Sequence, residues 1–230
     1  MKYIGIVVAM NEELEAILHN AKNVKYKEIK NMKFVECKIQ GKECVIVESG
    51  VGKVNAARTT QILIYEYNIS NIINIGVAGA ISDDLEIGDV VIAKKIVQHD
   101  FDITSFGHIK GYIPKVGNYI EANQNLLFEF ENKIKNMEKR QYKIKFGNVA
   151  TGDIFCTKVE MKNKIFAKFN ADVVDMECGA IAQVAFLERK PFIAVRSVSD
   201  ILNEKNVDLY NENLKLAAKR CADLLEECIG

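Results

Sequence analysis

Three acidic residues, Glu13, Glu177 and Asp200, are the side chains best suited by type and position to carry out chemistry. Each follows a short apolar run of strand type, and together they reach from residue 13 to residue 200. Carboxyl groups that meet in one cleft can exchange protons with a bound substrate. Each acid also has a simpler explanation, because Glu13 and Glu177 fit charges at helix N-termini and Asp200 fits an N-cap. The residues alone leave both interpretations open.

The elements that must position these acids alternate between two patterns. Short β-branched runs of strand type alternate with longer segments of helical period. We expect strands at residues 4–8, 34–39, 44–47, 72–75, 90–92, 144–149, 173–174 and 192–195. We expect helices at residues 12–20, 53–66, 122–137, 158–169, 178–187 and 207–228. This order predicts a three-layer α/β fold in which helices flank a mixed, mostly parallel sheet, built as one domain over residues 1–230.

Ligands of such sheets bind beyond the carboxyl ends of the strands, where this sequence places glycines as well as acids. The segments are Gly50-Val51-Gly52 and Gly76-Val77-Ala78-Gly79. The first is not a P-loop, because Val47 replaces the leading glycine and Val54 replaces the Ser or Thr. It is not a dinucleotide fingerprint either, because Asn55 replaces the third glycine. We expect these glycines to allow close backbone approach to a ligand or to form tight turns.

Composition narrows the class of ligand. The 230 residues contain 31 Lys plus Arg and 31 Asp plus Glu, so no net charge favours nucleic acid or an anionic membrane surface. No run of 18 apolar residues suggests a membrane span. The six cysteines form no CxxC pair and have no histidine at ligand spacing, which favours reduced, buried thiols in a cytoplasmic protein without a metal site. Residues 100–118 are predicted to form a long loop.

Eight motifs, in order along the chain, resemble those of the 5′-methylthioadenosine/S-adenosylhomocysteine nucleosidases. They are AMNEE at 9–13, SGVGKVNAA at 49–57, IGVAGA at 75–80, GDVV at 88–91, HDFDIT at 99–104, TGD at 151–153, VDME at 174–177 and SVSD at 197–200. The resemblance implies the purine nucleoside phosphorylase superfold and a homodimer that uses no cofactor and no metal. It also implies hydrolysis of the N-glycosidic bond of both nucleosides, with 5′-deoxyadenosine as a further substrate, in methionine salvage and methyl-cycle detoxification.

The resemblance divides the chemistry among the three acids. It implies that Glu13 is the general base that activates water, and that Asp200 is the general acid that protonates N7 of adenine. It implies that Glu177 binds the ribose hydroxyl groups, with Met176 beneath the sugar. Arg196 is expected to orient the carboxylate of Glu177.

The resemblance also assigns the remaining contacts. Phe155 is expected to stack on adenine, the backbone of Cys156 to bind its edge, and Ser199 to hold Asp200. Ala78 and Gly79 are further substrate-binding positions. The 5′-thioalkyl pocket is assigned to Val51, Met10 and Tyr210. The neighbouring subunit is expected to complete that pocket with Phe106, His108 and Pro114.

Three positions depart from the family pattern. Val77 stands where a small hydroxyl residue is common, which leaves the hydrogen bonding of the catalytic water open. His108 replaces a tyrosine and Tyr210 replaces a phenylalanine, and both substitutions concern the preference for the 5′ substituent.

Other functions remain as alternatives. A nucleoside phosphorylase would need cations around phosphate, but the first arginine of the chain is Arg58, and Glu13 would repel the anion. A hydrolase of futalosine-type nucleosides is a second alternative. A protein that only binds nucleosides is a third, although binding alone requires neither Glu13 nor Asp200.

Overall fold

The computed structural model describes residues 1–137, 140–201 and 207–230, the side chains of 207–210 excepted. Its strands are β1 (Tyr3–Val8), β2 (Lys22–Ile29), β3 (Met32–Ile39), β4 (Lys42–Glu48), β5 (Ile69–Ala80), β6 (Val90–Gln98), β7 (Ile120–Glu121), β8 (Ile144–Thr151), β9 (Val173–Asp175) and β10 (Phe192–Asp200). Its helices are α1 (Asn11–Leu18), α2 (Lys53–Glu66), α3 (Gln124–Lys135), α4 (Val159–Phe169), α5 (Cys178–Leu187) and α6 (Val207–Ile229), with a 3₁₀ turn, η1, at Thr104–Phe106. All six predicted helices and all eight predicted strands are present.

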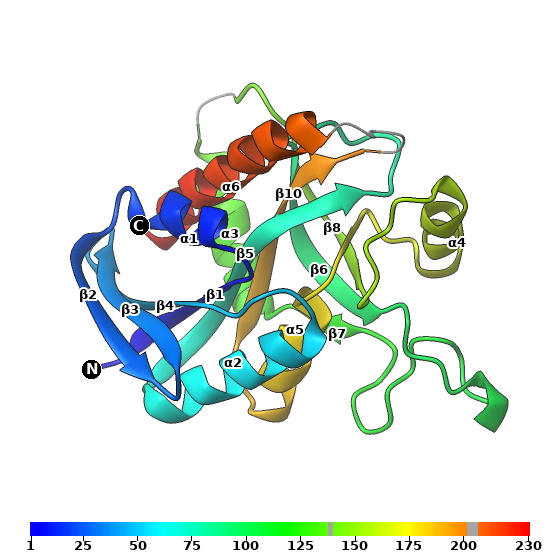
Figure 1. Ribbon diagram of the computed structural model, residues 1–230, viewed down its shortest axis with the longest axis horizontal. Helices are drawn as coiled ribbons and strands as arrows, with labels where there is room; N and C mark the ends of the chain where they lie inside the picture. Colours follow the sequence, from blue (N-terminus) through cyan, green and yellow to red (C-terminus); the bar gives the residue numbers. More distant parts are fainter. Residues whose placement is uncertain (138–139, 202–206) are drawn as a thin grey trace.

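The strands form one mixed sheet in the order β10-β6-β8-β9-β5-β1-β4-β3-β2, with β7 beside β6 (Figure 1). Strand β5 also pairs with β10, so β5, β9, β8, β6 and β10 close into a ring. Strand β1 lies between β5 and β4 and is parallel to both. The long strand β5 therefore belongs to both the ring and the open part of the sheet.

The predicted mixed α/β sheet is confirmed, with a larger antiparallel share than expected. Antiparallel pairs join β2 to β3, β3 to β4, β10 to β6, β5 to β9 and β6 to β7. Lys30 and Asn31, both at positive φ, form the tight turn between β2 and β3, as two-residue hairpin loops require. Strand β2 was not predicted because most of its residues are polar and its apolar alternation is limited to Val24 and Tyr26; seven of its eight residues are exposed.

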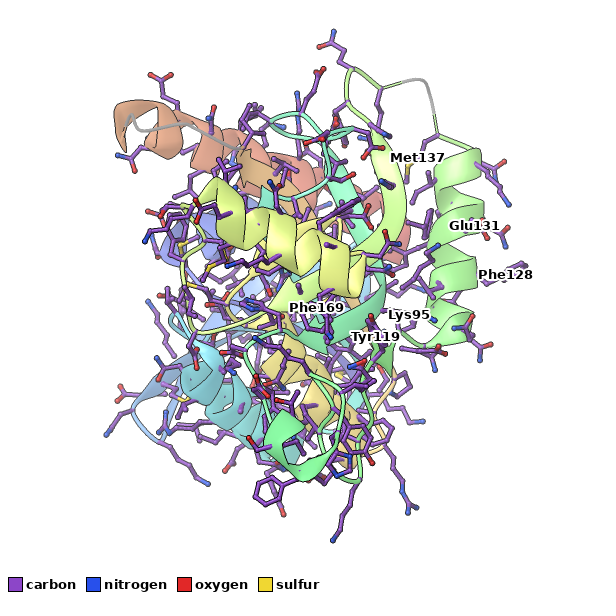
Figure 2. The ribbon with its side chains drawn as sticks, turned by 90° about the vertical axis from the view of Figure 1, so that its right-hand side faces the viewer. Lys95, Tyr119, Phe128, Glu131, Met137 and Phe169 are labelled. Carbon is purple, nitrogen blue, oxygen red and sulfur yellow. The ribbon has the colours of Figure 1, made fainter. Side chains whose placement is uncertain are left out.

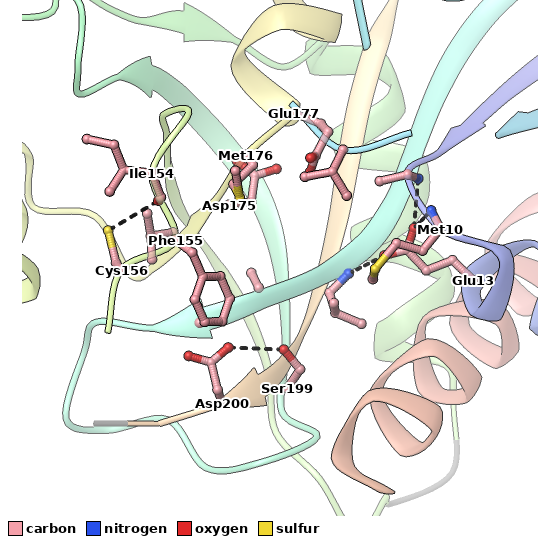
Figure 3. Close-up of a pocket in the computed structure, with 16 residues that line it drawn as sticks. Met10, Glu13, Ile154, Phe155, Cys156, Asp175, Met176, Glu177, Ser199 and Asp200 are labelled. Carbon is pink, nitrogen blue, oxygen red and sulfur yellow. Dashed lines mark hydrogen bonds between the residues drawn. The ribbon is translucent and has the colours of Figure 1, made fainter. Parts of the chain in front are cut away.

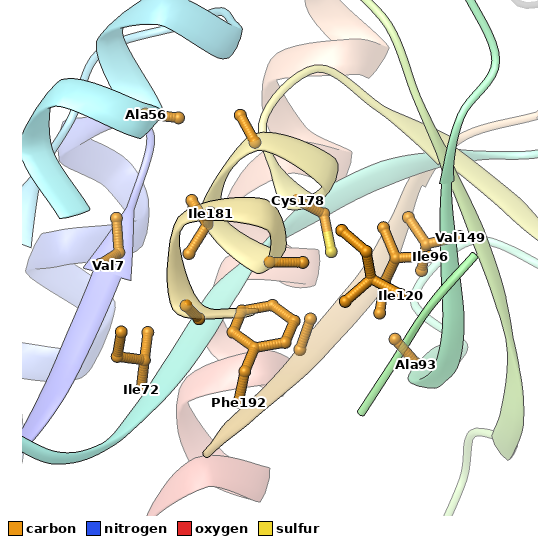
Figure 4. Close-up of a cluster of buried hydrophobic side chains, with 14 of the residues drawn as sticks. Val7, Ala56, Ile72, Ala93, Ile96, Ile120, Val149, Cys178, Ile181 and Phe192 are labelled. Atoms are coloured by element: carbon orange, nitrogen blue, oxygen red, sulfur yellow. The ribbon is translucent and has the colours of Figure 1, made fainter. Parts of the chain in front are cut away.

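Helices cover both faces of the sheet. Helices α1, α3 and α6 contribute Leu14, Phe130 and Leu224 to a buried cluster on one face. Helices α2 and α5 cover the other face, where Ile181 of α5 packs among side chains of the sheet (Figure 4). The three layers follow from these two clusters, since each helix buries one apolar stripe against the sheet.

Helix α4 lies to the side of the ring strands β6 and β8 (Figure 1). It buries Lys162, Ile165 and Phe169, which are spaced by three and four residues and share one helical face. The hydroxyl of Tyr119 donates to the backbone carbonyl of Phe169 at 3.3 Å. The helix ends at Asn170, whose φ of 47° is in the left-handed region. The ionisable side chain of Lys162 thus lies on the inward face of α4, next to the ring.

Two further expectations are confirmed. Residues 100–118 form an extended excursion whose regular structure is η1 and an isolated bridge between Ile113 and Gly117. All six cysteines are buried and free. Along the described residues, no helix combines the length and apolarity needed to cross a bilayer.

Candidate active site

A cavity of about 150 Å³ lies where β1, β5, β9 and β10 end, and it gathers acids from three separate segments (Figure 3). Its lining is Ala9, Met10, Glu13, Val51, Val77, Ala78, Gly79, Ile154, Phe155, Cys156, Val174, Asp175, Met176, Glu177, Ser199 and Asp200. Figure 3 shows Glu13 on one side of the cavity, and Phe155 with Asp200 on the other. The three acids predicted from the sequence therefore share one cavity at the expected edge of the sheet.

Glu13 is fixed by backbone N–H groups. It lies in the first turn of α1, where Oε2 accepts hydrogen bonds from the backbone N–H groups of Ala9 at 2.8 Å and Met10 at 3.1 Å. Oε1 accepts from the backbone N–H of Val77 at 2.9 Å. Burial raises the pKa of Glu13, and the N–H groups together with the guanidinium of Arg196 act in the opposite direction. The result is a rigidly held carboxylate that binds a proton more readily than an exposed one.

Glu177 lies between β9 and α5 at the N-cap position of that helix. Its Oε1 accepts a hydrogen bond from the backbone N–H of Gly52 at 2.8 Å, across 125 residues of sequence. Burial and the nearby charge of Asp175 raise the pKa of Glu177. Gly52 has a φ of 97°, so this turn conformation favours glycine. The turn after β4 therefore positions an acid at the end of β9.

Asp200 is held through both carboxylate oxygens. The hydroxyl of Ser199 donates to Oδ1 at 3.2 Å, and the ammonium of Lys162 donates to Oδ2 at 3.3 Å. The register of β10 against β5 shifts between Val198 and Asp200, which places Asp200 opposite Gly79. Such irregularities re-aim side chains next to sites. The predicted contact of Ser199 with Asp200 is present, and the contact with Lys162 was not foreseen.

Two glycines of β5 provide room for the acids. A Cβ atom on Gly76 would lie 2.9 Å from Oε1 of Glu13, and one on Gly79 would lie 2.8 Å from Oδ2 of Asp200. Both distances are shorter than ordinary contacts, so a side chain at either position would displace a carboxylate. The expectation of tight turns is therefore wrong for these two glycines, which lie within a strand and accommodate acidic side chains of this chain.

The expected partner of Arg196 is corrected. Its guanidinium is 2% exposed and donates from Nε at 3.0 Å and from Nη2 at 2.8 Å to Oδ2 of Asp175. Nη2 also donates to the side-chain oxygen of Asn74. A buried guanidinium requires such a set of acceptors. Arg196 therefore lies behind the cavity, paired with Asp175, and does not belong to the lining that was predicted for it.

Lys53, the first residue of α2, is held by acids from two other segments. Its Nζ lies 2.7 Å from Oδ1 of Asp100, and its side chain is 19% exposed. Its backbone N–H donates to Oδ1 of Asp153 at 2.8 Å, and the backbone N–H of Asp153 donates to Asp100 at 3.0 Å. This network, the Lys53 network, links the turn at residues 49–52 to the segments at 98–100 and 152–153.

The other predicted residues divide into three groups. The lining contains Met10, Val51, Ala78, Gly79, Phe155, Cys156 and Met176. Tyr210 has a side chain outside the described part of the chain. Phe106, His108 and Pro114 are exposed residues of the 100–118 excursion that do not line the cavity of their own chain.

Sequence reasoning missed Lys162 and Asp175. The signal for Lys162 was present, because a lysine occupies the apolar stripe of a helix in line with Ile165 and Phe169. The signal for Asp175 was a second acid two residues before Glu177. Among the described residues, no group of three or more His, Cys, Asp or Glu side chains is arranged to hold a metal ion.

Comparison with known proteins gives matches over the whole chain. A family model described as the phosphorylase superfamily matches residues 3–230. The 5′-methylthioadenosine/S-adenosylhomocysteine nucleosidase of Staphylococcus haemolyticus is 37% identical over 227 residues, 98% of either chain. The structure of this nucleosidase from Neisseria meningitidis in complex with methylthio-immucillin-A has a TM-score of 0.93 at 32% identity, covering 100% of this chain and 99% of that one. A futalosine hydrolase mutant of Helicobacter pylori also has a TM-score of 0.93, at 28% identity and the same coverage.

Proposed function

The chain belongs to the phosphorylase superfamily and, within it, to the 5′-methylthioadenosine/S-adenosylhomocysteine nucleosidases, and we propose that the cavity described above is where it hydrolyses the N-glycosidic bond of these two nucleosides. The observation that carries this assignment is the meeting of Glu13, Glu177 and Asp200 in one cavity beside Phe155. Hydrolysis requires an activated water, a proton for the purine and a hold on the ribose, and three carboxyl groups supply these functions.

Glu13 activates the water. Three backbone N–H groups hold its two oxygens, so the carboxylate is fixed before substrate binds. Its raised pKa makes it a better proton acceptor than an exposed glutamate. As the bond between C1′ and N9 breaks, the water oxygen bonds to C1′ and the water proton passes to Glu13. Val77 contributes its backbone N–H to Glu13, and its side chain has no hydroxyl group to offer the water.

Asp200 supplies the proton to the leaving group. The electron pair of the breaking bond passes into the purine, and the proton of Asp200 passes to N7, so that neutral adenine leaves. Ser199 and Lys162 hold the carboxylate while this occurs. The proton gained by Glu13 and the proton lost by Asp200 balance, and exchange with solvent restores both groups.

Glu177 binds the ribose. Its Oε1 already accepts one hydrogen bond from Gly52, and an ionised carboxylate has about four acceptor positions, which leaves room for two sugar hydroxyl groups. Met176 lies next to it in the lining, under the sugar in this arrangement. Phe155 offers an aromatic face for adenine at the other side of the cavity. Met10 and Val51 provide apolar surface for the 5′-thioether.

The active form is a homodimer in this proposal. The side chain of Phe106 is 81% exposed and that of Ile109 is 61% exposed, both in the 100–118 excursion. Exposed apolar side chains continue on α2 at Val54 and Tyr65. The ion pair between Lys53 and Asp100 joins the start of α2 to the root of the excursion. A second copy that covers this surface brings Phe106, His108 or Pro114 to the 5′ end of its partner's cavity.

The six free, buried thiols support a reducing compartment, and we place the protein in the cytoplasm.

A second candidate activity is hydrolysis of futalosine-type nucleosides, which the similarity to the Helicobacter pylori futalosine hydrolase favours. The reacting bond and the ribose are of the same kind, so the acids described here suit both reactions. The two activities differ in the size of the 5′ substituent that the pocket must accept. Release of the base from a panel of 5′-substituted nucleosides, including futalosine, measures that preference.

The proposal is tested by replacing each proton-transfer group with its amide. Glu13→Gln and Asp200→Asn are each expected to reduce adenine release from 5′-methylthioadenosine by ~10²–10⁴-fold, the usual contribution of such groups. Glu12→Gln is the matched control, because Glu12 neighbours Glu13 but is exposed to solvent. Near-normal turnover by either variant, with Glu12→Gln also active, would remove that residue from the mechanism.

A further inference from the structure

Lys162 is a buried ammonium group that the proposed reaction does not yet explain. Its side chain is 2% exposed, and it lies on the inward face of α4 rather than in the cavity lining. Lysine is almost never fully buried without a partner. Among the described residues, the acid that pairs with it is Asp200, at 3.3 Å from Nζ to Oδ2. The fold therefore encloses a positive charge directly behind the acid that must protonate adenine.

The acceptor positions of Asp200 show what this contact does for geometry. An ionised carboxylate has about four acceptor positions, two on each oxygen. Ser199 takes one on Oδ1 and Lys162 takes one on Oδ2. The carboxyl group fills the space beside Gly79, because a Cβ atom there would lie 2.8 Å from Oδ2. One position on each oxygen remains, which matches an adenine edge that offers the N6 amino group as a donor and N7 as a proton acceptor.

We propose that Lys162 is a positioning residue for Asp200, which orients this carboxyl group and stabilises the negative charge that it gains in the reaction. The proposal rests on the function assigned above. When the O–H bond of Asp200 breaks, its electron pair stays on the carboxylate while the proton bonds to N7 of the departing adenine. The ammonium of Lys162 keeps its own protons and strengthens its hydrogen bond to the newly formed charge.

The pH dependence of the reaction follows from the groups that face Asp200. Among the described residues these are Lys162 from α4 and the thiol of Cys156 from the segment before it, whereas β5 contributes the backbone of Gly79 and β10 the hydroxyl of Ser199. Burial raises the pKa of Cys156, so the thiol stays neutral where the enzyme works. Removing the ammonium takes away the positive charge that favours the ionised form of this carboxyl group, which makes release of its proton slower.

A purely structural role for Lys162 predicts a different pattern. If the ion pair only held α4 against β10, its loss would lower thermal stability and affect every variant of the enzyme equally. If Lys162 acts through Asp200, its substitution no longer affects kcat in a variant whose residue 200 cannot transfer a proton. The two roles are therefore separated by measuring the effect of Lys162 in two backgrounds.

The experiment compares Lys162→Met and Lys162→Arg with Lys164→Met, a control on the exposed side of the same helix. The substrate is 5′-methylthioadenosine, and adenine release is followed across the pH range. Lys162→Met is expected to lower kcat by roughly 10- to 100-fold, the value of a hydrogen bond to a charged group, and to move the alkaline limb of kcat/KM to higher pH. Lys162→Arg keeps the positive charge, so the alkaline limb of its kcat/KM profile is expected to lie at the same pH as in the wild-type enzyme.

In the Asp200→Asn background, Lys162→Met is expected to change kcat by less than about twofold, because the group through which it acts is already neutral. An equal loss in both backgrounds, or a Lys162→Met enzyme with wild-type kcat and pH profile, would overturn the proposal. An alkaline limb of the kcat/KM profile that moves equally in Lys162→Arg and Lys162→Met would also overturn the proposal. These outcomes are distinct from a failure of the assigned function, in which the wild-type enzyme and Lys164→Met release no adenine.

Discussion

Glu13 is a carboxyl group on which burial and hydrogen bonding act in opposite directions. Glu13 is only 2% exposed, and this burial favours the protonated form of its carboxyl group. Three hydrogen bonds from backbone N–H groups favour the ionised form. Burial is the larger effect, and it raises the pKa of Glu13 above the ordinary value of 4.5. The sequence placed this residue at a helix N-terminus. It could not reveal the bond to Val77, because that contact depends on β5 lying beside α1.

The acid limb of the pH profile follows from these shifts. A base must be ionised to accept a proton from water, and a raised pKa means that it becomes protonated at a higher pH than an ordinary carboxylate. The pKa of Glu177 is raised as well, and ionised Glu177 is the form that accepts two hydroxyl groups. We therefore expect kcat/KM for 5′-methylthioadenosine to fall, as pH decreases, at values above 4.5. Steady-state rates from acid to neutral pH measure this.

The control for that measurement is the folded state of the enzyme, followed by circular dichroism at each pH. A profile that stays flat from neutral pH down to pH 4.5 while the protein remains folded would contradict the assignment of Glu13 as the base.

At the scale of elements, the helices were predictable to within about two residues. Helices α2 and α5 begin and end at the predicted residues. The strands β5, β6 and β10 run several residues beyond their predicted ends. Glycine, serine and lysine interrupt the apolar runs there, and some of these residues, such as Gly79 and Ser199, serve the site. The apolar sequence pattern therefore predicts these strands too short, because their ends carry functional residues in place of apolar ones.

The Lys53 network gives a prediction at this scale. Lys53 ties residues 98–100 and 152–153 to the turn whose Gly52 N–H holds Glu177. Lys53→Met should loosen that turn and the hold on the ribose, and we expect KM for 5′-methylthioadenosine to rise by roughly tenfold with a smaller change in kcat, since a partly buried charged contact is worth about 1.5 kcal/mol. Lys30→Met is the matched control, because Lys30 forms an ion pair with Glu66 that is largely exposed.

Initial-rate kinetics of both variants provide the comparison. If Lys53→Met lowers only the melting temperature and leaves KM at the wild-type value, the network supports the fold and has no part in substrate binding.

At the scale of the whole molecule, the alternating pattern predicted the fold class but not the closure of the sheet. Strand β5 pairs with β1 from Ile69 to Asn74 and with β10 from Ile72 to Gly79, and β9 joins its end. These contacts connect residues at least 66 positions apart in the sequence, so no local pattern encodes them. Closure is what brings Glu177 and Asp200 to opposite sides of one cavity. The family resemblance supplied the roles of these acids that pattern and spacing left open.

The exposed apolar surface of the 100–118 excursion leads to a prediction about assembly. Phe106 is 81% exposed in one chain and is placed by the proposed dimer at the partner's 5′ pocket. We expect Phe106→Ala to raise KM for 5′-methylthioadenosine by roughly tenfold through lost apolar contact, and to leave the affinity for free adenine unchanged. Kinetics and adenine titration test this, with Phe128→Ala as the control because Phe128 is exposed on α3 (Figure 2).

Sedimentation velocity gives the oligomeric state under the same conditions. A fully active monomer at the assay concentration would rule out the shared pocket.

The central claim is that water, and not phosphate, attacks the ribose. Phosphate is an anion that needs free cations, but the described cations near the cavity are already paired: Arg196 with Asp175, Lys162 with Asp200 and Lys53 with Asp100. Adenine release from 5′-methylthioadenosine should therefore proceed at the same rate without phosphate and at saturating phosphate, with free 5-methylthioribose as the second product. A rate that rises with phosphate, or a sugar 1-phosphate among the products, would contradict the account.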